Sequence, residues 1–185
     1  MSKMEKKKIR QRVKAQVLSL SAEEKATQSC AVMARLRSAI ADRKPYVVAL
    51  FSPLNDEVQI APLADLLAQD YRVVLPRVGD REDGTPEMEF FDYTPQTMAS
   101  GAYGIIEPQS GEPCRAEEID LMVVPGVAFT REGVRLGRGK GYYDRYLARE
   151  GFRAYTIGVC YACQLCDALP CGEYDRRVDI VVAGE

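Results

Sequence analysis

The chain has 185 residues, of which 46% are apolar and 28% charged, and its formal net charge is −2. This length is typical of one domain, so we expect residues 1–185 to form a single domain. The charge balance gives no electrostatic footprint for nucleic acid, and no apolar run approaches the roughly 18 residues that span a bilayer. We expect a cytoplasmic protein with small-molecule partners, no nucleic acid and no membrane, as a monomer or weak homodimer.

Histidine is absent from the chain. Its absence removes the commonest general acid–base and excludes nucleophiles activated by a Ser–His or Cys–His pair. Any chemistry must rest on carboxylates, Lys, Arg, Tyr, backbone amides or bound cations.

The first 45 residues have the patterns of two helices. Helical spacing predicts the first helix over residues 3–19, with these apolar positions: Ile9, Val13, Val17 and Leu20. Ser21 and Glu24 have the spacing of a capping box, so a second helix begins there and runs to about Ala41 before Pro45. We expect its inner face to contain Ala26, Cys30, Met33 and residues on the side of Leu36, such as Ile40, with Arg37 on the wetter side.

Strands alternate with helices along the rest of the chain. Apolar runs predict strands at residues 46–51, 71–76, 119–124, 156–160 and 178–183, with 88–91 as a more exposed antiparallel edge. Helices are predicted at 59–69 and 141–149, and a polar turn at 79–86. This order indicates an α/β fold of three layers (α/β/α), with a Rossmann-like, mostly parallel (mixed) sheet and an N-terminal helical segment. Ligands then bind outside the carboxyl ends of the strands.

A glycine-rich basic segment follows the strand predicted at 119–124. Gly137, Gly139 and Gly141 alternate with Arg138 and Lys140, ahead of a predicted helix. Glycine lets backbone amides approach an anion, and the cations add charge, so the segment suits a polyphosphate. Neither the phosphate loop G-x-x-x-x-G-K-[ST] nor the fingerprint G-x-G-x-x-G is met, and a basic surface turn is the ordinary alternative.

The run R-L-G-R-G-K-G-Y-Y-D at 135–144 strongly resembles the signature of the 5-formyltetrahydrofolate cyclo-ligase family. The resemblance extends over nearly the whole chain. It includes Lys6, Arg10, Asp56-Glu57, the segment G-I-I-E-P at 104–108, residues 119–129, Gln164, Leu169-Pro170 and Asp175.

The resemblance implies a Rossmann-like enzyme that uses ATP as co-substrate and Mg²⁺ to convert 5-formyltetrahydrofolate to 5,10-methenyltetrahydrofolate. It implies ATP contacts from Lys6, Arg10, Arg135, Leu136, Gly137, Arg138, Gly139, Lys140, Gly141, Tyr142 and Tyr143. It implies folate contacts from Ser52, Glu57, Arg138, Gly139, Lys140, Gly141 and Tyr142, and metal contacts from Asp144 and Asp175. We expect Arg135, Arg138 and Lys140 to stabilise charge during phosphoryl transfer, with no protein nucleophile.

Each of these side chains also has an ordinary structural interpretation. Asp144 could favour the start of its helix, and Asp175 could pair with Arg176 or Arg177. Lys6 and Arg10 lie on a Lys-rich helix whose charges could simply be solvated. One of the two adjacent tyrosines could be a core residue, and Glu57 a loop acid.

Four cysteines near the C-terminus suggest a rival function. Cys160, Cys163 and Cys166 have C-x₂-C-x₂-C spacing, followed by Cys171, which partly resembles an iron–sulfur or zinc site. The position of Cys171 does not fit the ferredoxin pattern, and reduced thiols are the alternative. Other rivals are a kinase or sugar-phosphate isomerase on the same fold, and an inactive folate- or nucleotide-binding protein.

Overall fold

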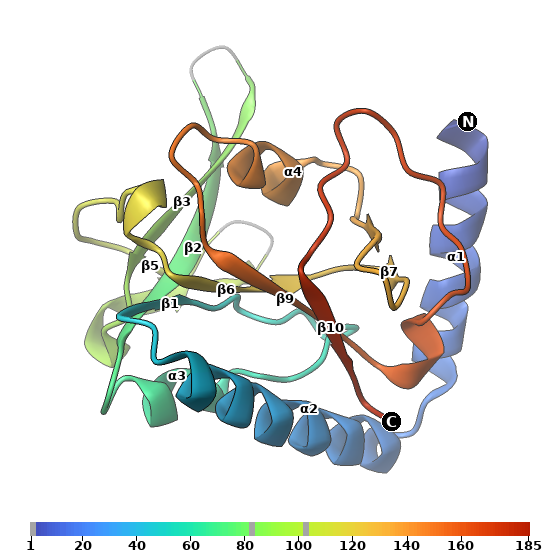
Figure 1. Ribbon diagram of the computed structural model, residues 1–185, viewed down its shortest axis with the longest axis horizontal. Coiled ribbons are helices and arrows are strands. Elements are labelled where there is room, and N and C mark those ends of the chain that lie inside the picture. Colours follow the sequence, from blue (N-terminus) through green and yellow to red (C-terminus); the bar gives the residue numbers. More distant parts are fainter. Residues whose placement is uncertain (1–2, 82–83, 102–103) are drawn as a thin grey trace.

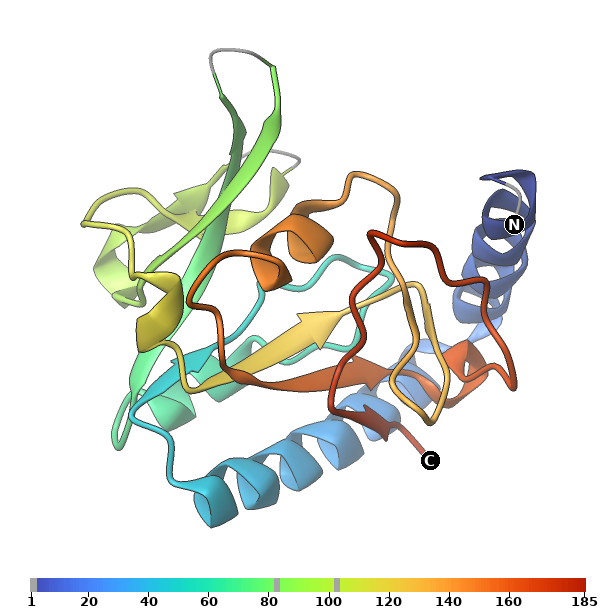
Figure 2. The same ribbon diagram turned by 45° about the horizontal axis from the view of Figure 1, so that its top comes forward.

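The computed structural model describes residues 3–81, 84–101 and 104–185 (Figures 1 and 2). It begins with two helices, α1 (Lys3–Ser19) and α2 (Ala22–Arg43). Ser21 and Glu24 form the predicted capping box, because the Ser21 hydroxyl accepts the Glu24 N–H at 3.1 Å and the Glu24 carboxylate accepts the Ser21 N–H at 2.7 Å. The sequence therefore predicted both helices correctly.

A mostly parallel sheet forms the centre of the described structure. Its strands are β1 (Val47–Ala49), β2 (Arg72–Asp80), β3 (Pro86–Asp92), β6 (Leu121–Pro125), β9 (Tyr155–Cys160) and β10 (Ile180–Ala183). They lie in the order β10-β9-β6-β1-β2-β3. All neighbouring pairs are parallel except β2 and β3, which are antiparallel. The predicted fold class and the antiparallel edge strand are confirmed.

The central strands are apolar throughout because both faces of the sheet are covered. In β6, Leu121 and Val123 join the core on one face, whereas Met122 and Val124 join the core on the other. This alternation follows from the two-residue period of a strand. It explains why the sequence shows continuous apolar runs and not an alternation of apolar and polar residues.

Helices cover both faces of the sheet, but one face carries much more helix than the other. In Figures 1 and 2, α2 and α3 (Pro62–Leu67) run beneath one face, and the short α4 (Tyr142–Leu147) lies above the other. Both short helices are shorter than the predicted 59–69 and 141–149. Helix α1 packs beside the turn of 3₁₀ helix η4 (Ala162–Gln164), which follows β9, and so lies near the carboxyl ends of the strands.

The predicted inner face of α2 is partly wrong. Ala26 and Cys30 are exposed and Met33 is half-buried, whereas the Leu36 side with Ile40 is fully buried as expected. The buried residues are Ser29, Val32, Leu36 and Ile40. Their spacing is also helical, so periodicity alone did not fix which stripe meets the sheet. Ser29 is buried there because its hydroxyl accepts the Gln59 N–H at 3.1 Å.

Several short elements were not predicted. Two small antiparallel pairs join β4 (Met98–Ser100) with β5 (Ile106–Pro108), and β7 (Ala128–Phe129) with β8 (Arg135–Leu136). The structure also contains 3₁₀ turns η1 (Pro95–Thr97) and η3 (Ala116–Glu118). The predicted turn at 79–86 was too long, because β2 continues to Asp80 and β3 begins at Pro86.

The order of the strands predicts where a ligand would bind. Following the chain, β2 lies on one side of β1, and β6, β9 and β10 lie on the other. The direction of winding therefore reverses between β1 and β6. In doubly wound sheets, ligands bind at this switch point, outside the carboxyl ends of the strands.

Candidate functional site

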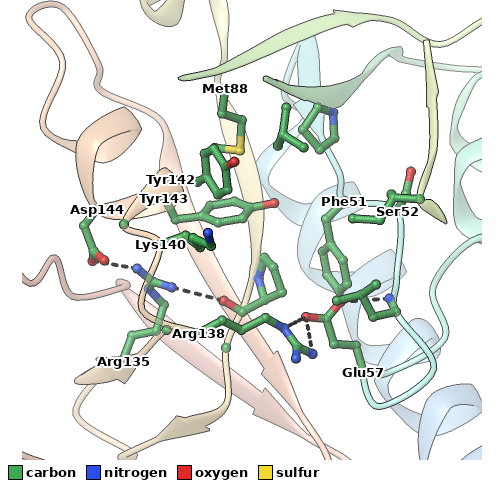
Figure 3. Close-up of a pocket in the computed structure, with 18 of the residues that line it drawn as sticks. Phe51, Ser52, Glu57, Met88, Arg135, Arg138, Lys140, Tyr142, Tyr143 and Asp144 are labelled. Atoms are coloured by element: carbon green, nitrogen blue, oxygen red, sulfur yellow. Dashed lines mark hydrogen bonds and ion pairs between the residues drawn. The ribbon is translucent and has the colours of Figure 1, made fainter. Parts of the chain in front are cut away.

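A cavity of about 390 Å³ occupies the switch point between β1 and β6. Phe51 and Ser52, just beyond β1, line it together with Pro125 and Gly126 at the end of β6. The remaining lining residues come from the 54–57 loop, β2, β3, β5 with the residue before it, and the 135–144 segment: Leu54, Glu57, Pro76, Val78, Met88, Ile105, Glu107, Arg135, Gly137, Arg138, Lys140, Gly141, Tyr142, Tyr143 and Asp144 (Figure 3). The glycine-rich basic segment is thus part of a cavity wall, not an isolated surface turn.

Positive backbone dihedrals shape the glycine-rich segment. Gly139 and Gly141 have φ values of 103° and 73°, a region that L side chains rarely adopt. Gly141 directly precedes α4, which has only six residues. Because α4 is so short, its dipole adds little to the segment, and the cations are the main attraction for an anion.

Arg138 joins the segment to the acidic loop that follows β1. Its guanidinium donates to Glu57 Oε1 at 3.0 Å and to both Asp56 oxygens at 2.6 and 3.2 Å. Burial raises the pKa of Glu57, although the charge of Arg138 opposes this effect. Burial also acts to raise the pKa of Asp56, but hydrogen bonds and the charge of Arg138 outweigh it and lower that pKa. Asp56 belongs to the family resemblance, which implied no contact for its side chain. In the structure it binds the Arg138 guanidinium.

Arg135 and Asp144 form a second ion pair at the cavity. Arg135 is 5% exposed, and its Nη2 donates to Asp144 Oδ1 at 2.6 Å. Its Nη1 donates to the Pro125 carbonyl at 3.4 Å, and its Nε has no hydrogen-bond partner in the described part of the chain. In Figure 3 this pair and the Arg138–Glu57 pair lie on opposite sides of the cavity. A buried cation is thereby held at the cavity wall.

The N-terminal helix reaches the same segment. Arg10 Nε donates to the Gly137 carbonyl at 2.7 Å, and Lys6 forms an ion pair with Asp175. Burial acts to raise the pKa of Asp175, but the Lys6 and Gly172 hydrogen bonds and the Lys6 charge lower it overall. Lys6 and Arg10 are therefore not merely solvated surface charges, and Asp175 pairs with Lys6 instead of Arg176 or Arg177.

The two adjacent tyrosines line the cavity and also contact the core. Tyr142 and Tyr143 are half-buried and pack against core clusters, and burial raises the pKa of Tyr143. Figure 3 shows both rings beside Met88, above the two arginines. Both tyrosines therefore pack against the core and line the cavity, and their contact with a ligand stays a prediction.

Not every candidate residue faces the cavity. The side chain of Leu136 is buried in the core, and its carbonyl accepts the Val127 N–H at 2.8 Å, so it is absent from the lining. Lys140 is exposed and lines the rim, and Ser52 is half-buried and lines the wall. Sequence reasoning missed Glu107, a buried lining residue within the segment G-I-I-E-P that carried part of the resemblance.

The structure gives no support to a cysteine metal site. It describes all six cysteines, and each is a free thiol. Among the described residues, no group of three or more His, Cys, Asp or Glu side chains could hold a metal ion. Cys160 is buried, which raises its pKa to about 12, whereas Cys171 is exposed. The iron–sulfur or zinc interpretation is therefore wrong.

Fold and site together define a doubly wound α/β protein with a mostly apolar, cation-flanked cavity at its switch point. The model of the 5-formyltetrahydrofolate cyclo-ligase family matches residues 2–184. The chain belongs to the 5-formyltetrahydrofolate cyclo-ligase family. The family expected from the 135–144 signature is thus confirmed.

Individual relatives resemble the chain over most of its length. The chain is 28% identical to 5-formyltetrahydrofolate cyclo-ligase of Mus musculus, with 96% of this chain and 92% of that protein covered. Its structure resembles that of 5,10-methenyltetrahydrofolate synthetase from Aquifex aeolicus, with 36% identity, a TM-score of 0.84, and 97% and 90% of the two chains covered. The synthetase from Mycoplasma pneumoniae gives 26% identity, a TM-score of 0.78, and 97% and 99% coverage.

A helix that spans a membrane is at least about 18 residues long and predominantly apolar, and no described helix meets both conditions.

Proposed function

We propose that this chain converts 5-formyltetrahydrofolate to 5,10-methenyltetrahydrofolate with ATP, releasing ADP and phosphate. The observation that carries the proposal is the cavity at the switch point, which combines apolar walls with Arg135, Arg138 and Lys140. An apolar cavity with a few convergent polar groups suits a flat heterocycle, and the cations suit a phosphoryl group beside it. The family match over residues 2–184 gives this arrangement its substrate.

The proposed chemistry activates a poor electrophile. The formyl oxygen of the substrate attacks the γ-phosphorus of ATP, so that an O–P bond forms and the bond to the leaving ADP breaks. The folate N10 then attacks the formyl carbon and loses its proton. Cleavage of the C–O bond releases inorganic phosphate and leaves the methenyl bridge. Because both steps need positioning and charge stabilisation, no protein nucleophile is required.

The cations have separate proposed tasks. Lys140, exposed at the rim, and Arg138 would stabilise charge on the phosphoryl group as it moves between oxygens. Arg135, held by Asp144, would present fixed positive charge from the wall. The ATP-binding residues proposed are Lys6, Arg10 and 135–143, with Leu136 contributing only through its backbone. The contact of Arg10 with Gly137 supports placing α1 beside the nucleotide.

Folate is proposed to bind along the cavity itself. Ser52, Glu57 and Arg138, together with Gly139, Lys140, Gly141 and Tyr142, are the proposed contacts. Glu57 would act mainly by holding Arg138, since one of its oxygens already accepts from Arg138 and the other from the Leu54 N–H at 3.0 Å. Tyr142 and Tyr143 offer ring faces against which a pterin could stack.

Asp144 and Asp175 are the proposed Mg²⁺ ligands. The Arg176 N–H donates to Asp144 Oδ1 at 3.2 Å, so the two aspartates belong to one neighbourhood. Mg²⁺ is usually bound by one or two carboxylates plus phosphate oxygens and water, so a pair of aspartates fits it. Within the described ranges, no group of three or more potential ligands surrounds them. Bound Mg²⁺ would supply charge neutralisation on the phosphates. Arg135 and Lys6 pair with these two carboxylates and so lie beside the proposed metal site, where their charges would also face the phosphates.

We further propose that residues 1–185 act as one domain in the cytoplasm, as a monomer or weak homodimer, with no nucleic-acid or membrane partner. The six free thiols support a reducing compartment.

The function is tested by incubating the purified protein with 5-formyltetrahydrofolate, ATP and Mg²⁺. The methenyl product absorbs in the near ultraviolet, so its formation is followed directly. We expect product only when ATP and the folate are both present, with ADP and phosphate formed in equal amounts. Absence of product across a range of nucleotides and divalent metals would refute the proposal.

A further inference from the structure

A smaller groove adjoins the cavity, and no role has yet been assigned to it. It has a volume of about 200 Å³ and lies between α1 and the side chains of Asp56, Val127 and Arg138. Arg138 lines both the cavity and the groove, so the two spaces meet at its side chain. A pocket for a whole small molecule usually has roughly 300–1,000 Å³. The groove therefore suits one part of a larger ligand whose remainder lies in the cavity.

The lining of the groove is positively charged. Arg10, Lys14 and Arg138 contribute three cations and Asp56 contributes one carboxylate, which leaves a formal excess of two positive charges. Both oxygens of Asp56 already accept from Arg138, at 2.6 and 3.2 Å. The carboxylate is thus neutralised within the protein, and the groove as a whole attracts an anion.

Lys14 is the cation of the groove that a ligand can reach most easily. Its side chain is exposed, and within the described ranges it forms no hydrogen bond or ion pair. Its charge nevertheless lowers the pKa of Asp56, so the ammonium group lies near the groove wall. An anion can therefore bind Lys14 without displacing an internal partner.

The cations on this face of α1 have separate neighbours. Lys6, Arg10 and Lys14 follow one another at intervals of four residues, so they lie on one face of the helix. Lys6 pairs with Asp175, and Arg10 Nε donates to the Gly137 carbonyl at 2.7 Å. Lys14 lies one turn further along α1 and lines the groove. It is therefore distinct from the two α1 cations that are proposed to contact the nucleotide.

Apolar side chains complete the groove. Val13 and Val17 are buried, and Val127 is half-buried. A phosphate group has no apolar part that could cover these valines. A glutamyl unit has both parts that the groove calls for, because it combines two methylene groups with a carboxylate.

Resting on the proposed function, we propose that the groove binds the glutamyl tail of the folate and that Lys14 determines the preference for this tail. The pterin lies in the cavity, and the tail leaves the cavity past Arg138. Its methylene groups pack against Val13 and Val17, and a tail carboxylate accepts a hydrogen bond from the Lys14 ammonium group. Lys14 is thus a specificity-determining residue that lies outside the reacting part of the site.

The test varies Lys14 and the length of the tail together. Wild type, Lys14→Gln and Lys14→Arg are compared with three substrates: 5-formyltetrahydropteroate, which has no glutamyl residue, and 5-formyltetrahydrofolate with one and with three. Turnover is measured as kcat/KM, and binding of the same compounds is measured by calorimetry in the absence of ATP. Lys8→Gln is the matched control, since Lys8 is an exposed lysine of the same helix that does not line the groove.

We expect wild type to prefer the glutamyl substrates to the pteroate by about fivefold or more, the size of effect expected for a charge-assisted hydrogen bond at a partly exposed site. Lys14→Gln should lower kcat/KM for both glutamyl substrates about fivefold or more and leave the pteroate unchanged. Lys14→Arg should retain most of the preference because it keeps the cation. The KM for ATP should stay unchanged in all variants, and Lys8→Gln should behave as wild type.

An unchanged preference in Lys14→Gln would overturn the proposal, and so would an equal loss with all three substrates. A raised KM for ATP in Lys14→Gln would also overturn it, because the groove would then hold a phosphate of the nucleotide. The same loss in Lys8→Gln would do so as well, since the overall charge of α1 would then be responsible. Calorimetry separates this inference from the proposed function, because a protein without turnover can still show or lack the preference for the tail in binding.

Discussion

Replacing Arg138 by methionine should destabilise the protein in a pH-dependent manner. The substitution keeps much of the apolar stem but removes the cation from Glu57 and Asp56. Glu57 is 7% exposed, and among the described residues its carboxylate would keep the hydrogen bond from the Leu54 N–H but lose its cation. A buried carboxylate without its cation is costly, so the structure predicts a stability loss that depends on whether Glu57 is ionised.

The size of the effect follows from the geometry of the pair. Two unit charges 3.0 Å apart attract by about 5.5 kcal/mol at an effective dielectric constant of about 20. The Arg138 side chain is 38% exposed, so water screens the pair, and removing the cation also relieves its own desolvation. We therefore expect a loss of about 2 kcal/mol when Glu57 is ionised.

The pH dependence has a definite sign. Burial already raises the pKa of Glu57 above its unfolded value, and loss of Arg138 raises it further. The folded variant therefore takes up a proton that the unfolded chain does not hold, and its stability falls as pH rises through that window. The pKa of Asp56 is lowered, so Asp56 is ionised at both about pH 5 and about pH 8, and loss of its Arg138 partner costs the same stability at both. The loss should be about 2 kcal/mol at about pH 8 and clearly smaller at about pH 5.

Urea denaturation of wild type and variant at both pH values measures this difference. Arg149→Met is the matched control, because it breaks a similar ion pair with Glu89 whose two side chains are both 27% exposed. We expect it to cost about 1 kcal/mol or less, equally at both pH values. The double variant Arg138→Met/Glu57→Gln should lose the pH dependence. Equal losses for Arg138→Met at the two pH values would refute the reasoning.

Three further variants test other parts of the site and core. Lys140→Ala should raise the KM for ATP about tenfold or more with an unchanged melting temperature, since Lys140 is exposed at the rim, and an unchanged KM would remove it from the nucleotide site. Asp144→Asn should raise the Mg²⁺ concentration needed for half-maximal rate, and an identical metal titration would contradict its proposed role. Tyr146→Phe should leave the stability equal or higher by up to about 1 kcal/mol in urea denaturation, because its buried hydroxyl has no partner among the described residues; a clear loss would show that this hydroxyl is hydrogen-bonded.

The sequence was most informative where a pattern is local. The capping box at Ser21 and Glu24 and the apolar runs of β1 and β6 depend on residues close together in the chain, so both the helix start and the buried strands could be predicted. The glycine-rich segment was also visible, because Gly139 and Gly141 take backbone dihedrals that few other residues accept. The family followed from the same segment.

Element boundaries and the inner face of α2 were less predictable. Two stripes of α2 have helical spacing, and the sheet selects the one with Val32 and Leu36. The spacing of apolar residues within one helix does not determine which of its faces packs against a sheet whose strands are distant in the sequence. For the same reason the short β4–β5 and β7–β8 pairs were missed, since each is held by contacts with the rest of the fold and not by its own sequence.

By itself, the sequence determined the alternation of helices and strands, the absence of histidine chemistry and the presence of a basic, glycine-rich turn. Only the tertiary structure decided which charges meet. Lys6 contacts Asp175 across 169 positions, and Arg138 meets Glu57 across 81. Ion pairs and hydrogen bonds form between groups that are close in space. For segments that a sheet brings together, the separation along the sequence does not show which groups these are. Glu107 illustrates the point, because only the packing of β5 against β2 places its carboxylate in the cavity.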